Sequence, residues 1–146
     1  MIINEKELRT IITDPNGAIQ LVEKAKELGQ RFAPQEKGRK EDKKERLSSS
    51  QIRAIFGEVR QIEAQWHMGG EKRKKAERRL ILLKPKMAYR ARKERSRSIR
   101  ELVDILTAAI DMVVEEKDDK KRTENFTRFV EFFEAILAYH KAFGGD

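Results

Sequence analysis

The sequence contains no cysteine, and only three prolines and eight glycines occur among its 146 residues. Without cysteine the chain has no disulfide, no thiolate metal ligand and no cysteine nucleophile, a composition that suits a reducing cytoplasm. The scarcity of proline and glycine leaves long stretches without a helix breaker, and no segment alternates apolar and polar residues for long. These absences favour an all-α fold.

Long apolar runs are also missing. Nowhere do eighteen apolar residues follow one another, and the N-terminal stretch MIINEKELRT has an acidic residue at position 5 where a secretion signal would have an apolar core. We therefore expect a cytoplasmic protein that is neither secreted nor membrane-spanning. A helix lying on a membrane surface would need larger apolar anchors than residues 71–97 supply, since no Trp or Phe occurs there.

Apolar residues recur at the three- and four-residue spacing of a helix face. The clearest case runs from Ile52 to Trp66, after a capping sequence at Ser48 to Gln51. Other helix starts are predicted at Asn4, at Asp14 followed by Pro15, at Ser98 and at Thr123. We predict one domain over residues 1–146, a compact helical bundle of about five helices with a charged, mobile linker near residues 34–47.

Charge is the most uneven property of the chain. Lys and Arg number 33 against 25 Asp and Glu, which gives a net charge of +8. Residues 71–100 alone hold 14 Lys and Arg against 3 Asp and Glu, a net +11 that exceeds the charge of the whole chain. Such a concentration is typical of a surface that meets nucleic acid, although a basic face that meets only water is the plain alternative.

Helical geometry sorts residues 71–97 into two stripes. One stripe is uncharged and should pack against the core; it consists of Ala76, Leu80, Leu83, Met87 and Ala91. The other is cationic, with Tyr89 beside its lower half; it consists of Lys72, Lys75, Arg79, Lys86, Arg90, Lys93 and Arg97. Pro85 should kink this helix or split it in two. Because cations are so frequent here, the uncharged stripe is the more informative of the two.

Three stretches together resemble a known family. SSSQIRAIFGEVRQIE at 48–63, LLKPKMAY at 82–89 and FVEFFEAILAYHKAFGG at 129–145 resemble the small subunit of the type III-A CRISPR effector, the Csm complex. The resemblance implies a helical protein without catalysis and without a cofactor. It also implies that copies stack as the inner filament of a ribonucleoprotein, beside the backbone and large subunits, and contact guide RNA and target RNA through basic surfaces.

Candidate RNA-binding residues come from two sources. The resemblance points to Arg53 and Arg60 in the first stretch and to Lys84 and Lys86 in the second. Spacing along the basic segment adds Arg90, Arg92, Lys93 and Arg97, with Tyr89 as the one candidate for base stacking. A subunit that accepts any guide should contact phosphates through Lys and Arg and leave base identity to Watson–Crick pairing.

Two other functions stay open at the level of sequence. Arg60 and His67 have the spacing of the Arg and His in helical HEPN ribonucleases, although Gln61 stands where a polar Asn, Asp or His usually follows the arginine. A basic helix would also suit a sequence-indifferent DNA-binding protein, but no helix-turn-helix or zinc motif supports that reading. Metal catalysis is not indicated, because the two histidines, His67 and His140, are far apart in sequence.

Overall fold

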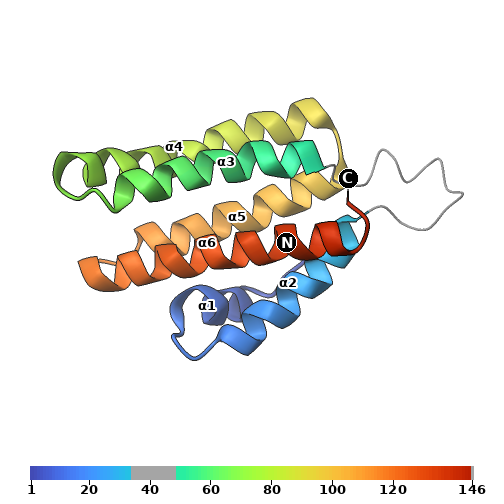
Figure 1. Ribbon diagram of the computed structural model, residues 1–146, viewed down its shortest axis with the longest axis horizontal. Coiled ribbons are helices and arrows are strands. Elements are labelled where there is room, and N and C mark those ends of the chain that lie inside the picture. The colour runs from blue at the N-terminus through green and yellow to red at the C-terminus, as the bar shows by residue number, and fades with distance from the viewer. Residues whose placement is uncertain (34–48, 146) are drawn as a thin grey trace, which may run out of the picture.

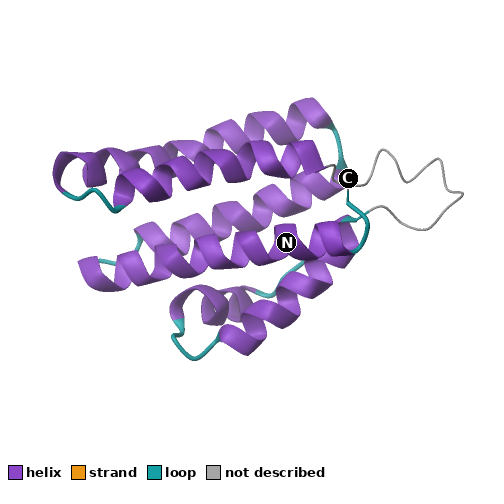
Figure 2. Cartoon of the chain, viewed as in Figure 1, coloured by secondary structure: helices purple, strands orange, loops and turns teal. Residues whose placement is uncertain are grey.

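The computed structural model describes residues 1–33 and 49–145, and this part of the chain is helical without any strand (Figures 1 and 2). The described helices are α1 Glu5–Thr13, α2 Ala18–Phe32, α3 Ser49–Trp66, α4 Gly70–Glu94, α5 Arg97–Val114 and α6 Asp119–Ala142. The all-α prediction is confirmed, and the expected number of about five is one short. The linker predicted at 34–47 and the cap predicted at Ser48 lie outside the described residues.

The helices form three layers of two (Figure 1). α3 and α4 make one outer layer, α5 and α6 the middle one, and α1 and α2 the other outer layer. α6 contacts α1, α2, α3 and α5, so the last helix in the chain is also the central one. α4, in contrast, packs mainly on α3 and α5, which leaves a long face of this helix toward solvent.

Aromatic residues of α6 fill the core between the layers. Four phenylalanines of this helix are almost fully buried: Phe126, Phe129, Phe132 and Phe133. The Trp66 ring, at the end of α3, stacks on Phe126 with 4.3 Å between ring centroids and an interplanar angle of 18°. The indole Nε1 of Trp66 donates a hydrogen bond to Thr123 Oγ1 at 3.1 Å, so the one polar atom of the buried indole is satisfied.

Helix starts were predicted with mixed success. Asn4 caps α1 as expected, because its side chain accepts a hydrogen bond from the Lys6 backbone N–H at 2.7 Å. The cap of α5 is Ser96 and not Ser98, and α6 begins one turn before Thr123, with Asp118 as its cap. In both cases several residues able to cap lie close together, and sequence spacing alone does not choose among them.

The Asp14 and Pro15 pair was wrongly predicted to open a helix. α2 starts later, after Gly17, and Pro15 lies in the turn between α1 and α2. The Asp14 side chain accepts from the Asn16 backbone N–H at 2.8 Å, so it stabilises that turn.

Pro85 was predicted to kink its helix or to split it in two, and the split does not occur, because α4 runs from Gly70 to Glu94 as one helix. A proline at this position cannot donate to the carbonyl of Ile81, four residues earlier. Both Pro85 and Ile81 are exposed, so water can bind that carbonyl where a buried one would be left without a partner.

Arg128 of α6 binds the C-terminal end of α1. Its Nε donates to the Ile12 carbonyl at 2.7 Å, and its Nη2 reaches the Thr13 carbonyl at 3.4 Å and Asn125 Oδ1 at 2.9 Å. The last turn of α1 has no basic residue of its own, so this guanidinium supplies the positive charge that a helix C-terminus favours.

We expect Arg128→Met to lower the free energy of unfolding by about 1–2 kcal/mol, because carbonyls at the end of α1 lose charged hydrogen bonds. Denaturant titration measures the loss, and amide exchange should show that α1 becomes less protected than α3. Lys121→Met, on the exposed side of the same helix, is the control and should change stability little. Equal stability of both variants would contradict this role for Arg128.

Candidate nucleic-acid interface

The uncharged stripe of α4 faces the core as predicted. Its five residues are all buried: Ala76, Leu80, Leu83, Met87 and Ala91. The opposite side of the helix is therefore turned to solvent. Ile81, Leu82 and Tyr89 are exposed on α4, and the Tyr89 side chain is 71% exposed. The basic segment thus has one apolar side that is buried in the core and an outer side that a partner can reach.

Part of the cationic stripe is engaged with α3. The Arg79 guanidinium donates to Glu58 Oε1 at 3.1 Å and also reaches Gln61 and Gln65, and Lys86 Nζ lies 3.5 Å from the same Glu58 oxygen. Burial alone would raise the pKa of the Glu58 carboxyl, but the hydrogen bond from Arg79 and the charges of Arg79 and Lys86 outweigh it. The pKa therefore lies below its usual value. These cations help to hold α4 against α3.

Lys84 and Arg90 also have partners within the protein. Lys84 Nζ makes a close ion pair with Asp111 on α5, and Arg90 Nη1 lies 3.8 Å from Glu94 Oε1 on its own helix. Lys84 is only partly exposed, so it lies between α4 and α5 rather than on the outer face. A phosphate group would have to compete with these carboxylates.

The two candidate residues on α3 also differ in whether they have a partner within the protein. Arg60 pairs with Glu63 at 2.9 Å and lies over the Phe56 ring at 5.5 Å from its centroid. Arg53 is exposed, and no ion pair joins it to any residue that the structure describes. It lies in the first turns of α3, at the same end of the molecule as the connection between α4 and α5 (Figure 1).

The end of α4 carries cations without carboxylate partners. Arg92 and Lys93 are exposed and make no ion pair within residues 1–33 and 49–145. Arg97, the first residue of α5, is exposed as well. Of the predicted residues, Arg53, Arg92, Lys93 and Tyr89 thus lie where RNA could reach them with least rearrangement.

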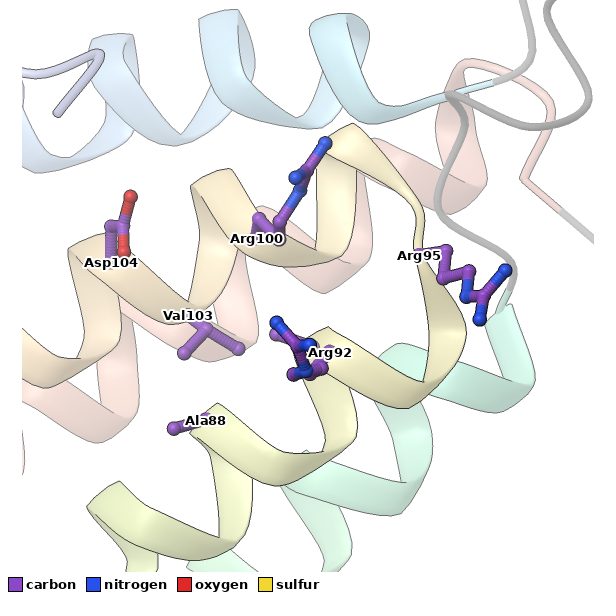
Figure 3. Close-up of a pocket in the computed structure, with 7 residues that line it drawn as sticks. Ala88, Arg92, Arg95, Arg100, Val103 and Asp104 are labelled. Carbon is purple, nitrogen blue, oxygen red and sulfur yellow. The ribbon is translucent and has the colours of Figure 1, made fainter.

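A concavity of about 680 Å³ lies where α4 turns into α5, and we call it the corner pocket (Figure 3). It is lined by Ala88, Ala91, Arg92, Arg95, Arg100, Val103 and Asp104. Sequence reasoning singled out only Arg92 in this set. Arg95 and Arg100 were missed because the basic segment was treated as one helix up to residue 97, whereas α4 ends at Glu94. The serines at 96 and 98 were the available signal for a turn.

The ribonuclease pair is not assembled into a site. Arg60 is held by Glu63 and Phe56, while His67 is exposed just beyond the end of α3. The two residues are seven positions apart, which corresponds to about 10 Å along a helix axis. His140, the other histidine, is buried in α6.

The described helices therefore define a small all-α protein in which one strongly basic helix, α4, lies in an outer layer. Residues 1–33 and 49–145 contain no group of His, Asp and Glu side chains placed to hold a metal ion, and none of their helices is long and apolar enough to cross a membrane.

The chain belongs to the Csm2 Type III-A family, whose model matches residues 16–146. It is thus a small subunit of the type III-A Csm complex of CRISPR systems and has its partners in that complex. Comparison with curated proteins and with solved structures gave no match.

Proposed function

We propose that this protein binds the backbone of guide or target RNA, as a non-catalytic subunit of the inner filament of the Csm complex in the cytoplasm. Copies would stack along the filament beside the backbone and large subunits. The observation that carries the proposal is the group of exposed cations without carboxylate partners at the end of α4. Most other arginines of the described residues have carboxylate or carbonyl partners, as Arg31 has with Glu101 at 2.8 Å.

The chemistry of these side chains suits a sequence-indifferent contact. Lys and Arg bind phosphate oxygens regardless of the base, and Tyr89 offers an exposed ring on which any base can stack. We rank Arg53, Arg92 and Lys93 first among the contact residues. Arg60, Lys84, Lys86 and Arg90 remain candidates, but each would have to leave an ion pair within the protein.

The test is a fluorescence-anisotropy titration with a single-stranded RNA of arbitrary sequence, repeated over a range of salt concentrations. Affinity should fall linearly with log salt, with a slope of about −0.7 per phosphate contact. Duplex DNA of equal length should bind more weakly; equal or tighter DNA binding would favour a DNA-binding protein instead. Cleavage of the RNA during the titration would favour the ribonuclease alternative.

Two variants separate the exposed cations from the paired ones. Arg92→Gln combined with Lys93→Gln should weaken RNA binding about fivefold to twentyfold at 0.1 M salt, because two phosphate contacts of about 1 kcal/mol or less are lost. Lys84→Gln should change the affinity less than about twofold, because Lys84 already pairs with Asp111. The reverse order of effects would show that RNA approaches the side of α4 that faces α5.

A further inference from the structure

The connection between α4 and α5 has an unusual backbone. Only two residues separate the helices, and the first, Arg95, adopts a left-handed conformation with φ 58° and ψ 11°. It is the one described residue other than glycine with positive φ, a conformation that normally favours glycine because a side chain is strained there. Ser96, the second, is buried and caps α5 through a 3.4 Å hydrogen bond from the Ile99 backbone N–H. The turn is therefore held in place, and an arginine occupies its strained position.

The corner pocket carries three arginines that no carboxylate neutralises. Arg92 comes from α4, Arg95 from the turn and Arg100 from α5, and none of them forms an ion pair with a residue in the described part of the chain. Asp104 is the one acidic side chain in the lining. The remaining lining residues are Ala88, Ala91 and Val103, which are small, apolar and offer the guanidiniums no hydrogen-bond acceptor.

The arrangement of these side chains limits what the pocket can bind. Figure 3 shows the Arg95 and Arg100 side chains running in different directions, with Arg92 standing apart from both. Three guanidiniums that chelate one phosphate would point to a common centre, and these do not. Side chains that spread from a concave floor are better placed to contact several phosphates of one flexible strand. A rigid duplex would bridge the concavity without following it.

We propose that a single RNA strand passes over the corner pocket, with Arg92, Arg95 and Arg100 each contacting a different phosphate. This inference rests on the proposed RNA-binding function and gives the strand a path over the protein. On this proposal Arg95 and Arg100 are RNA-binding residues. The strained turn directs the Arg95 side chain to a different phosphate from those that Arg92 and Arg100 contact.

The experiment compares three single variants, Arg92→Gln, Arg95→Gln and Arg100→Gln, with the triple variant in the salt-dependent RNA titration. Each single change should reduce the slope of log affinity against log salt by about 0.7, and the triple change by about 2. A triple variant that loses only about 0.7 in slope would mean that all three arginines share one phosphate. That result would overturn the inference.

A matched control removes three exposed lysines elsewhere: Lys26, Lys117 and Lys120. This variant has the same net charge as the triple arginine variant, and its slope should stay near that of the wild type. If the two triple variants lose equal affinity, the arginines act only through net charge and the inference fails. If wild type binds RNA and the arginine variant binds as tightly, the strand does not cross the corner pocket, while the proposed function stands. Absence of RNA binding by wild type would instead refute the proposed function.

Arg95→Gly separates binding from folding. Glycine relieves the strain at φ 58°, so this variant should unfold at a higher denaturant concentration than wild type while its salt slope falls by about 0.7. A purely structural role for Arg95 would give unchanged RNA affinity, which would overturn its place in the proposed path.

Discussion

Gly29→Ala is expected to destabilise the protein by about 3 kcal/mol, at the upper end of the cost of overpacking a core. A Cβ atom at Gly29 would lie 2.5 Å from Tyr139 Cβ and 2.8 Å from the His140 backbone nitrogen. The obstruction is largely backbone of α6, which cannot turn aside as a long side chain could. α2 and α6 would have to move apart along their whole contact, and the layer formed by α1 and α2 would loosen.

Gly57→Ala is the matched control for this change. Gly57 also lies within a helix, but a Cβ there would meet no atom within 4 Å. Alanine should therefore stabilise α3 by about 0.5–1 kcal/mol, because glycine loses more backbone freedom on folding. Urea titrations of both variants give the two values. A Gly29→Ala protein as stable as wild type would mean that α2 and α6 do not approach each other this closely.

Phe126→Ala is expected to cost about 3–5 kcal/mol, the range for a large aromatic removed from a core. Phe126 is fully buried and touches two other aromatic rings: Trp66 at 4.3 Å and Phe129 at 6.2 Å between centroids. Its loss leaves a cavity between α3 and α6, so the outer layer of α3 and α4 loses part of its packing on the middle layer. Phe126→Leu should cost less, since much of the volume is kept.

Thermal unfolding followed by circular dichroism, together with Trp66 fluorescence, measures this effect. The exposed ring of Tyr89 is the control, and Tyr89→Ala should change stability by less than about 0.5 kcal/mol. Trp66 emission should shift to longer wavelength in the Phe126→Ala protein as water reaches the indole. An unchanged emission maximum and melting temperature would contradict the packing described for this ring pair.

The periodic parts of the fold could be predicted from the sequence, because periodicity depends only on helix geometry. The uncharged stripe of α4 and the apolar face of α3 are buried as expected. Where the prediction failed, the deciding interactions were not periodic. Phe132 is buried beside Phe133, which a single apolar stripe does not predict, because α6 packs against other helices on more than one side. Gly29 carries no signal of its own, since the need for it comes from α6, more than a hundred residues away.

The candidate site shows the same division. That residues 71–100 present cations at the surface followed from composition and spacing. The sequence did not predict which of these cations are neutralised. Their partners Asp111 and Glu58 come from other helices, whose positions the sequence does not reveal. Arg95 and Arg100 escaped notice for a similar reason, since their importance depends on where α4 stops and how sharply the chain turns.

The central place of α6 has a consequence for synthesis of the protein in the cell. α1 and α2 leave the ribosome first, but the helix that both of them pack against begins only at Asp119, 87 positions after α2 ends at Phe32. At about 5–20 residues per second, their apolar faces wait roughly 4–17 s for that partner. During this interval Leu28 and Phe32 are not buried against α6, so we expect chaperones to bind the nascent chain. Ribosome stalling before α6 is complete would leave an aggregation-prone fragment.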